Sequence, residues 1–590
     1  MSNNCAIPLN SPEFIVCSDK LCKRYVNGKH ITTALNDVSL RILPGSLTAL
    51  VGPDGAGKTT LMRLLAGLLQ PTEGHLQVLG LDVRTSAHVI QARIAYMPQR
   101  FGLYEDLTVQ ENLDLYADMH GVPQNLRPQR YAQLLEMTDL AHFTRRLAGR
   151  LSGGMKQKLG LACTLVRSPE LLLLDEPTVG VDPLSRRELR LIIRQLVNVE
   201  RLTVLTSTAY LDEAEHCHRA IVLSEGKVLA DCEPSALSGT AEGHVFLLSP
   251  PIGGLARNLQ VQLLDHPLVA DALPQGGMVR MVLRHPHALE QLGLAGFVQP
   301  KMQAPNFEDG FMLLLAKNQP KNSSDIVADA LKKPVMPANQ ENVIEVHDLV
   351  RNFGAFTAVD HVSFVVKRGE IFGLLGPNGA GKTTTFRMLC GLLAASSGSL
   401  RVLGQDMRLA RSSARRRIGY MAQKFALYGE LTVSENLNFF ASAYDLHGSQ
   451  RQHRLAWAIE QFGLEAMLNT PSGQLPGGFR QRLAMAAALM HEPEVLFLDE
   501  PTSGADPQAR RDFWRRITGL AAQGITIVVT THFMEEAEYC DRALIQDAGR
   551  ILVQGTPAEI RRHAPVRDDL APTMEDAFIN IVNQARQHEA

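Results

Sequence analysis

A glycine-rich phosphate-binding loop occurs twice in this chain, and the two copies constrain the fold more than any other feature. The first copy reads Gly52-Pro-Asp-Gly-Ala-Gly-Lys-Thr-Thr60 and the second reads Gly376-Pro-Asn-Gly-Ala-Gly-Lys-Thr-Thr384. Each loop follows a short apolar run, at 47–51 and at 371–375, that we predict to be a buried strand. Each loop also leads into a helix that begins near its lysine. The order strand, loop, helix predicts a nucleotide-phosphate site in each copy.

The two copies belong to a duplicated module. Lys58 and Lys382 are 324 residues apart, and the same separation relates Asp175 to Asp499. With 590 residues, the chain has room for two such modules and a further domain. We therefore interpret the chain as a tandem duplication of one ATPase module.

Each part of the phosphate loop has a chemical reason. Its glycines permit backbone conformations that direct several N–H groups at the phosphates, its lysine reaches the β- and γ-phosphates, and the next threonine binds magnesium. The residues assigned to the phosphates are Gly52, Gly55, Gly57, Lys58, Thr59 and Thr60 in the first copy and Gly376, Gly379, Gly381, Lys382, Thr383 and Thr384 in the second.

A second apolar run in each module ends in a pair of carboxylates. The runs 171–175 and 495–499 read as buried strands of a largely parallel sheet that is covered on both faces. Asp175 and Asp499, at the strand ends, are suited to hold Mg²⁺ together with Thr59 and Thr383. The next residues, Glu176 and Glu500, are suited to orient or deprotonate the attacking water. The predicted cofactors are therefore ATP and Mg²⁺, and the predicted fold class is α/β.

The domain boundaries follow from the repeat and from the composition. We expect the first module at 13–240 and the second at 343–560. Between them, an alternating run at 278–284 and a short helix around 287–292 predict a small α+β accessory domain at 241–316. A polar, proline-containing linker is expected at 317–342, and a tail with a truncated accessory motif at 561–590.

Composition limits the partners and the setting. The 59 Lys+Arg and 61 Asp+Glu give a net charge of −2, which gives no support for nucleic-acid binding. Eight scattered cysteines are typical of a reducing cytoplasm, and the group at 216–218 is expected to lie in a helix and not to bind metal. No apolar run reaches the roughly 18 residues of a membrane-spanning helix. Any membrane crossing is therefore expected from another chain.

A further motif, Leu151-Ser-Gly-Gly-Met-Lys-Gln157, resembles the signature of the ATP-binding-cassette (ABC) family, and the resemblance covers nearly the whole chain. It implies two P-loop nucleotide-binding domains, each with an α/β core and a helical subdomain, that form an intramolecular head-to-tail dimer. In that arrangement the signature of one cassette faces the nucleotide of the other. The residues that the resemblance assigns are Ser152, Gly153 and Gly154 to nucleotide binding, Gln99 and Gln423 to magnesium and to sensing the membrane subunits, Asp182 and Asp506 to the dimer interface, and Tyr25 and Phe353 to stacking on adenine.

Two departures from the family pattern fall on one nucleotide site. The second signature has Pro476 where the family has serine, and Ala209 stands in the first module where the second has the switch histidine, His532. The resemblance therefore assigns catalysis to Glu500, His532 and Gln423, with Glu176 in a degenerate site. Loss of a positioned polar group typically costs about a hundredfold in rate, so we expect the first site to hydrolyse at least about a hundredfold more slowly. Neutral drift in a module that still turns over slowly is the alternative.

Two segments point to the process that the modules drive. Residues 101–112 and 425–436 resemble the segment that contacts the membrane subunits in exporters of the ABC-2 class, and the ends 305–311 and 572–578 resemble the C-terminal motif of daunorubicin-resistance-type ATPases. The leading hypothesis is an ATPase subunit of a drug, lipid or ion exporter, with one or two separately encoded permease subunits at the cytoplasmic face of the bacterial inner membrane. The alternatives are a ribosome-associated translation factor of the cassette type and a tandem sugar-importer ATPase.

Overall fold

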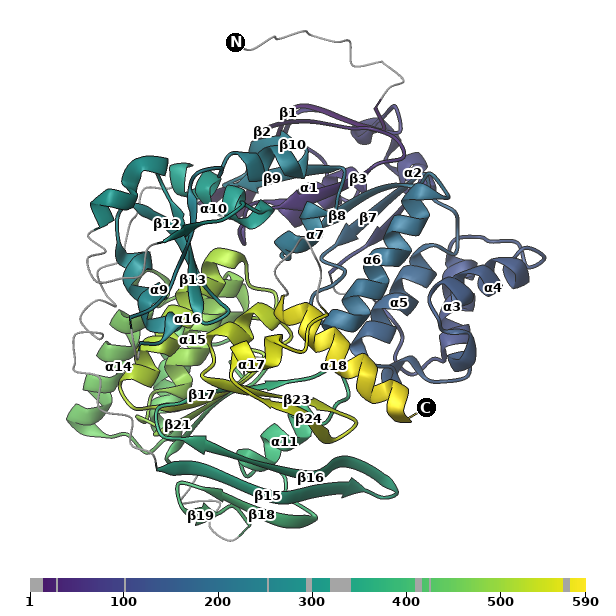
Figure 1. Ribbon diagram of the computed structural model, residues 1–590. Helices are drawn as coiled ribbons and strands as arrows, with labels where there is room; N and C mark the ends of the chain where they lie inside the picture. Colours follow the sequence, from purple (N-terminus) through teal and green to yellow (C-terminus); the bar gives the residue numbers. More distant parts are fainter. Residues whose placement is uncertain are drawn as a thin grey trace. The chain divides into compact units, whose positions relative to one another are not determined.

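The computed structural model describes residues 14–27, 30–99, 102–251, 254–292, 300–318, 341–408, 416–423, 426–565 and 573–589. The chain divides into two compact units (Figure 1). The first contains Met1–Glu242 and Ala304–Leu315, and the second contains Gly243–Gln303 and Ala316–Ala590. Each unit holds one of the two phosphate-loop modules.

A six-stranded sheet forms the centre of the first unit. Its order is β10-β9-β3-β8-β7-β6, in which β6, β7, β8, β3 and β9 run parallel and β10 is antiparallel to β9. The strands are β3 (Leu47–Val51), β6 (Ile94–Met97), β7 (Leu171–Asp175), β8 (Thr203–Ser207), β9 (Arg219–Ser224) and β10 (Lys227–Cys232). All residues of β3, β7 and β8 are buried, as expected for parallel strands covered on both faces. The phosphate loop and the acidic pair therefore leave the sheet at the same edge.

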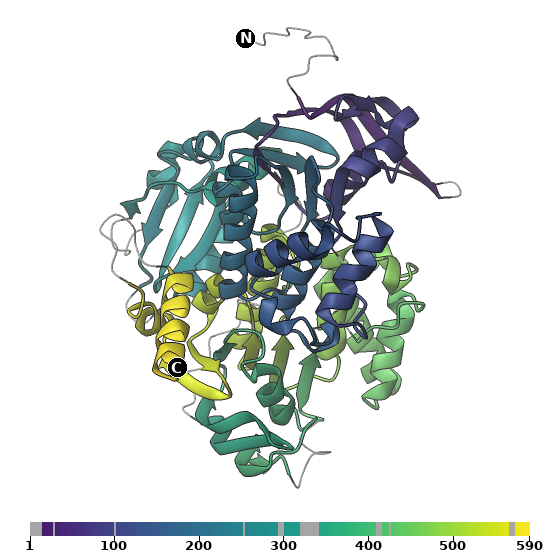
Figure 2. The same ribbon diagram turned by 90° about the vertical axis from the view of Figure 1, so that its right-hand side faces the viewer.

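A second, antiparallel sheet and the helices complete this unit. Figure 2 shows the sheet in purple, with the long β1–β2 hairpin extending from it. Its order is β2-β1-β4-β5, with bounds β1 (Val16–Asn27), β2 (His30–Ile42), β4 (Glu73–Val78) and β5 (Leu81–Asp82). The helices are α1 (Lys58–Leu65), α2 (Val83–Arg93), α3 (Val109–Met119), α4 (Arg127–Met137), η1 (Ala141–Phe143), η2 (Ala148–Arg150), α5 (Gly153–Thr164), α6 (Pro183–Asn198), α7 (Leu211–Glu215), α8 (Pro234–Gly239) and α10 (Phe307–Asn318). Helices α3 and α5 pack together through a core that includes Leu113 and Leu159.

The cassette of the second unit repeats this architecture. Its central sheet has the order β20-β21-β22-β17-β23-β24, and its antiparallel sheet has the order β16-β15-β18-β19. The strands are β15 (Asn342–Phe353), β16 (Phe356–Lys367), β17 (Ile371–Leu375), β18 (Ser397–Val402), β19 (Gln405–Asp406), β20 (Ile418–Met421), β21 (Val495–Asp499), β22 (Thr526–Thr530), β23 (Arg542–Asp547) and β24 (Arg550–Gly555). The helices are α11 (Lys382–Leu389), α13 (Val433–Ala443), α14 (Gly448–Phe462), η5 (Glu465–Met467), η6 (Ser472–Gln474), α15 (Gly477–Ala488), α16 (Pro507–Ala522), η7 (Met534–Tyr539), α17 (Pro557–Arg561) and α18 (Met574–Glu589).

The segment expected as an accessory domain, 241–316, divides between the two units. Residues Gly243–Gln303 form an antiparallel sheet of order β12-β13-β11-β14 with one α-helix and belong to the second unit. The elements are β11 (Val245–Leu248), α9 (Ala256–Asp265), β12 (Val269–Gln275), β13 (Met278–Leu283), the 3₁₀ helix η3 (Pro286–Leu292) and β14 (Lys301–Met302). Helix α10 instead buries Phe307 and Phe311 in the core of the first unit and runs to Asn318, two residues into the range expected as the linker. Most of that linker, 319–340, lies outside the described residues.

The predicted fold class is confirmed: each unit contains a P-loop nucleotide-binding domain with an α/β core and a helical subdomain. Among the described residues, no helix combines the length and the apolar character needed to cross a bilayer.

Candidate nucleotide-binding sites

The phosphate loops begin at the carboxyl ends of β3 and β17, where close backbone contacts require glycine. Gly57 and Gly381 precede helices α1 and α11 and have φ values of 103° and 97°. A Cβ atom on Gly57 would lie 2.5 Å from the Ala34 carbonyl oxygen, and one on Gly381 would lie 2.3 Å from that of Ala358. Both the left-handed conformation and the contact exclude a side chain. The loop is therefore fixed against the hairpin strand beside it.

The loop lysines are buried and are held by the loops themselves. Lys58 Nζ donates to the carbonyl oxygens of Gly52 at 2.7 Å and Pro53 at 3.2 Å. Lys382 Nζ makes the equivalent bonds to Gly376 at 2.6 Å and to Pro377 at 2.9 Å. Thr59, Thr60, Thr383 and Thr384 lie in the first turns of α1 and α11, at the positive ends of those helices. Each loop thus concentrates positive charge where phosphates are expected.

A hydroxyl group on the neighbouring strand positions both members of each acidic pair. Ser207, at the end of β8, donates through Oγ to Asp175 Oδ1 at 2.6 Å, and the same Oγ accepts from the Glu176 N–H at 3.0 Å. In the second cassette Thr530 Oγ1 donates to Asp499 Oδ1 at 2.6 Å and accepts from the Glu500 N–H at 2.9 Å. Sequence reasoning missed this role. The sequence did contain a signal for it, because a hydroxyl residue, Ser207 or Thr530, lies two residues before Ala209 or His532.

The glutamates of the acidic pairs have a strained backbone and a shared glutamine partner. Glu176 has φ 52° and Glu500 has φ 47°, in the left-handed region that costs about 1–3 kcal/mol for a non-glycine residue. Gln99 Nε2 donates to Glu176 Oε2, and Gln423 Nε2 donates to Glu500 Oε2, each at 2.5 Å. The structure therefore brings these glutamines to the glutamates and not directly to Asp175 or Asp499.

Burial changes the acidity of these carboxylates. It raises the pKa of Glu176 to about 7, an effect that the positive charge of Lys58 partly offsets. Burial also raises the pKa of Asp499, with the Thr530 hydroxyl acting in the opposite direction. In the absence of a bound cation, these acids therefore hold their protons more tightly than exposed carboxyls.

The two cassettes differ beside the second glutamate. His532 Nε2 pairs with Glu500 Oε1, and both side chains are buried. The His532 Nδ1 atom has no hydrogen-bond partner among the described residues, which favours the tautomer with the proton on Nε2. The corresponding Ala209 has a methyl group in its place and is equally buried. The first cassette therefore lacks an imidazole at its Glu176.

Each cassette has a buried glutamate, Glu213 or Glu536, that accepts hydrogen bonds from two threonines. One threonine lies in the loop after the acidic pair, and the other directly precedes Ala209 or His532. In the first cassette Glu213 Oε2 accepts from Thr208 Oγ1 at 2.7 Å and from Thr178 Oγ1 at 3.1 Å, and burial raises the pKa of Glu213 to about 7. In the second, Glu536 accepts from both Thr502 and Thr531. Thr531 directly precedes His532, so Glu536 positions the backbone that carries the imidazole.

The residues predicted for the signature and for the dimer interface cap helices. Ser152 Oγ accepts from the Met155 N–H at 3.3 Å at the start of α5, where Gly153 and Gly154 form the first turn. Pro476, at the same place before α15, makes no side-chain cap because it has no hydroxyl. The carboxylates of Asp182 and Asp506 cap α6 and α16. These residues begin helices α5, α6, α15 and α16, whereas the acidic pairs lie at the ends of strands β7 and β21.

Two other predicted positions have defined surroundings. Tyr25 on β1 and Phe353 on β15 are 39% and 47% exposed, so part of each ring is available for stacking. A cationic side chain lies over each ring. The 216–218 group was expected in a helix, but it follows the end of α7 at Glu215 and forms a turn. His218 Nδ1 accepts from the Leu47 N–H at 3.0 Å at the start of β3. His218 therefore has a structural partner.

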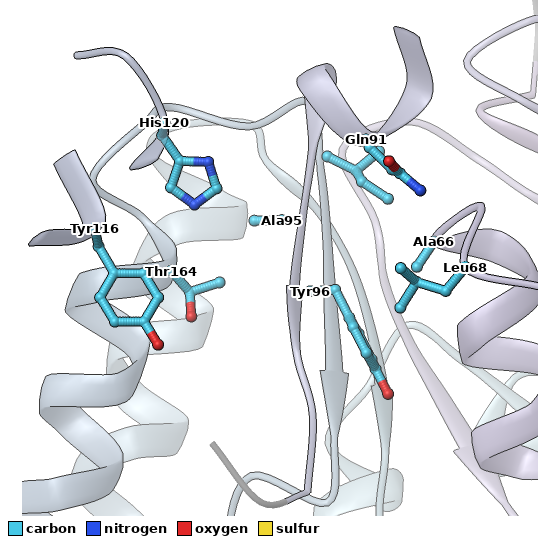
Figure 3. Close-up of a pocket in the computed structure, with 9 residues that line it drawn as sticks. Ala66, Leu68, Gln91, Ala95, Tyr96, Tyr116, His120 and Thr164 are labelled. Carbon is cyan, nitrogen blue, oxygen red and sulfur yellow. The ribbon is translucent and has the colours of Figure 1, made fainter. Parts of the chain in front are cut away.

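A cavity of about 190 Å³ lies in the first cassette beside the strand that leads to Gln99. Figure 3 shows Tyr116, His120 and Thr164 on one side and Ala66, Leu68 and Gln91 on the other, with Ala95 and Tyr96 on strand β6 between them. Leu68, which lines the cavity, and Tyr104, Val89 and Met119 of the same cassette are more than half exposed. Tyr428 is 50% exposed at the position of Tyr104 in the second cassette. The first halves of the segments 101–112 and 425–436, from 102 and 426, therefore present aromatic surface to solvent, whereas Phe101 and Phe425 lie outside the described residues.

Comparisons with known proteins agree with this geometry. Residues 35–179 and 359–503 each match the family described as ABC transporter. The chain is 48% identical over 559 residues to the "Probable multidrug ABC transporter ATP-binding protein YbhF" of Escherichia coli (strain K12), which covers 93% of this chain and 95% of that protein. It is 44% identical over 222 residues to the "Nod factor export ATP-binding protein I" of Ralstonia nicotianae, covering 38% of this chain and 69% of that protein. A solved structure described as "Structure of ATP binding subunit of ABC transporter" matches with a TM-score of 0.37 and 31% identity over 41% of this chain and 99% of the other.

Proposed function

Because this chain belongs to the ABC transporter family and is an ATPase built from two ATP-binding cassettes, we propose that it supplies the energy for an exporter whose membrane-spanning subunits are separate chains. The names of two relatives support export: one is called a multidrug ABC transporter protein and the other a Nod factor export protein. The segments 101–112 and 425–436 resemble the segment that contacts the membrane subunits in ABC-2 exporters. This resemblance supports assignment of the exporter to the ABC-2 class, with this chain at the cytoplasmic face of a bacterial inner membrane.

The partner that we propose is a cytoplasmic helix of a permease subunit. The cavity beside β6 is lined partly by apolar side chains, of which Leu68 is 55% exposed, and β6 leads to Gln99, which bonds to Glu176. A helix seated there would contact the strand that leads to Gln99, the partner of Glu176. One or two permease subunits would complete the transporter, with Tyr104 and Tyr428 as contacts.

Hydrolysis is proposed to take place mainly at the site that contains the second phosphate loop. The observation that carries this proposal is the contact between His532 and Glu500, which has no counterpart at Glu176 beside Ala209. Glu500 would orient or deprotonate the attacking water, and His532 would hold that carboxylate and the γ-phosphate in position. The head-to-tail pairing that the family resemblance implies would add the Ser152 signature to this site and the Pro476 signature to the other.

Magnesium fits the residues present in both cassettes. Asp175 and Thr59, or Asp499 and Thr383, supply the carboxylate and hydroxyl oxygens that this hard cation prefers. When bound, Mg²⁺ would neutralise charge on the phosphates. The Ser207 and Thr530 hydroxyls keep the carboxylates oriented for it.

Glutamine substitutions test the assignment of hydrolysis. Glu500→Gln removes the carboxylate at the competent site and is expected to lower steady-state ATPase activity by about a hundredfold or more. Glu176→Gln is the matched control and is expected to change the rate by less than about twofold to threefold, because that site contributes little turnover. Equal losses in the two variants would contradict the asymmetric model.

A membrane pull-down tests the exporter assignment. The tagged chain, isolated from gently solubilised membranes, is expected to carry an apolar multi-span subunit, and a ribosome pellet is expected to lack the chain. Tyr104→Ala combined with Tyr428→Ala should release the membrane subunit while ATP binding persists. Recovery of the chain with ribosomes instead would favour the translation-factor alternative.

A further inference from the structure

The accessory domain follows the first cassette in sequence but belongs to the compact unit of the second cassette. Residues Gly243–Gln303 share that unit with Ala316–Ala590. Helix α9 packs against α16 (Figure 1), and strand β12 packs against η7. Leu273 of β12 joins the apolar core of the second cassette.

Ionic contacts accompany this packing and are largely buried. Asp271 and Arg511 pair at 3.2 Å, with side chains that are 3% and 6% exposed. Removing one partner of a pair this deeply buried strongly destabilises the folded protein, because the other charge stays buried without a partner. The further contacts are Arg257 with Asp541, Asp265 with Arg515, and the Gly276 N–H with Glu538 at 2.8 Å. The contacts of the accessory domain with the second cassette, within the described residues, thus include ion pairs, a backbone hydrogen bond and apolar packing.

The contacted elements are those that carry or adjoin the hydrolytic residues. Helix α16, which contains Arg511 and Arg515, begins directly after Asp506 and follows the loop that leaves Glu500. The 3₁₀ helix η7 starts two residues after His532 and contains Glu536, which bonds to Thr531. The accessory domain therefore contacts the helix that follows Glu500 in the chain and the 3₁₀ helix that follows His532.

The first cassette differs at three of the corresponding positions. Arg187 occupies the position of Arg511 and is exposed, and Leu191 occupies the position of Arg515 and is 57% exposed. His218 and Asp541 each accept the N–H at the start of the phosphate-loop strand. Only the carboxylate of Asp541 can also pair with an arginine such as Arg257.

We propose that the accessory domain is a built-in positioning element for ATP hydrolysis by the second cassette. Asp271, through Arg511, is a positioning residue that holds α16, and the contact of Gly276 with Glu538 holds η7. This inference rests on the proposed assignment of hydrolysis to the second cassette. It predicts that loosening the accessory domain slows turnover without weakening ATP binding.

A charge-exchange series on the full-length chain tests this role. Asp271→Arg and Arg511→Asp are each expected to lower kcat by about tenfold while KM for ATP changes by less than about twofold, and the double exchange should recover most of the loss. Asp271→Asn is a milder variant that keeps the side-chain shape. Arg187→Asp is the matched control on the exposed face of α6 and should leave kcat unchanged. Hydrogen exchange of the amides of α16 and η7 should accelerate in the single variants and slow again in the double variant.

Two outcomes would contradict the inference, and one parallel measurement separates it from the proposed function. Normal kcat in Asp271→Asn and Asp271→Arg, with faster exchange in α16, would show that the accessory domain only stabilises the fold. A kcat that stays low in a folded double variant would show that the Asp271–Arg511 pair is not the cause. Retained turnover in Glu500→Gln would contradict the assignment of hydrolysis, whereas lost turnover in Glu500→Gln together with normal Asp271 variants would contradict the positioning role alone.

Discussion

The two cassettes share a framework and differ in what surrounds the hydrolytic carboxylate. Both hold a buried loop lysine, an aspartate fixed by a hydroxyl and a glutamate bonded to a glutamine. In the part of the chain that the structure describes, a histidine lies against the glutamate of the second cassette, and the accessory domain belongs to the same compact unit. The loop lysine and the acidic pair are therefore duplicated, while the imidazole beside the glutamate belongs to the second copy.

This difference matters because binding and hydrolysis need different precision. Phosphate binding depends on the loop N–H groups, a lysine and a helix terminus, which are insensitive to a missing imidazole. Water attack depends on polar groups placed within hydrogen-bonding distance of the reacting atoms. Substitutions that exchange features between the cassettes can therefore break or sharpen the comparison.

The largest effect is expected from His532→Ala. Removing the imidazole that pairs with Glu500 should lower kcat by about a hundredfold or more, because a positioned polar group at the reacting centre is lost. ATP binding, measured with a fluorescent analogue, should persist. Ala209→His alone is the reciprocal change and should have little effect. Turnover within about twofold of the unmodified chain in His532→Ala would remove the main distinction between the cassettes.

Repair of the first site is expected to give the next largest effect. In a Glu500→Gln background, Ala209→His with Pro476→Ser should raise ATP hydrolysis by about tenfold or more, because an imidazole and a hydroxyl are both restored. Each change alone should do little. The recovered activity should disappear on Glu176→Gln. Background turnover in the double variant, with ATP bound at that site, would mean that other features set the asymmetry.

A smaller loss is expected from Glu536→Gln. Glu536 accepts from the hydroxyls of Thr502 and Thr531, and an amide can accept from only one of them through its oxygen. Displacement of Thr531, beside His532, should lower kcat by about threefold to tenfold with unchanged ATP affinity. Glu213→Gln is the corresponding change in the first cassette, where a single oxygen accepts from both Thr178 and Thr208, and it should leave kcat nearly constant. Equal losses would indicate a general folding role for both carboxylates.

Nucleotide stoichiometry tests whether the first site still binds. Lys58, Thr59 and Asp175 are all in place, so Glu500→Gln protein should retain about two ATP per chain in a trapping experiment. Lys58→Ala added to that background should reduce the value to about one. Retention of a single ATP without the lysine change would mean that the first cassette has lost binding as well.

The smallest effect concerns pH and Glu176. Burial raises the pKa of this carboxyl from 4.5 to about 7, so the folded state binds the proton more tightly than the unfolded state. Stability from this group is present at low pH and is lost as the pH rises toward and through 7. Glu176→Gln should therefore raise the melting temperature of the nucleotide-free protein by about 2–4 °C at pH 8 and by less at pH 5. An equal shift at both pH values would contradict the raised pKa.

The sequence by itself determined the duplicated α/β framework. The features of this framework are local patterns, because each can be recognised from residues that are close together in the chain. They are the glycine loops, the buried runs that end in Asp175 and Asp499, and the order of strand, loop and helix. The replacements at Ala209 and Pro476 were also visible, since in each case the other copy supplied the reference residue, His532 or Ser152. The outer limits of the accessory domain were less clear, because composition does not show that helix α10 returns to the first core.

Tertiary structure alone decided which distant residues meet. Ser207 and Thr530 reach the acidic pairs because β8 and β22 lie beside β7 and β21 in the sheet, a strand order that no local pattern specifies. Asp271 and Arg511 are 240 residues apart in the chain, and their pairing depends on the accessory domain packing against α16. Such long-range contacts follow from burying complementary charge and apolar surface together. The sequence contains both partners but not the packing that joins them.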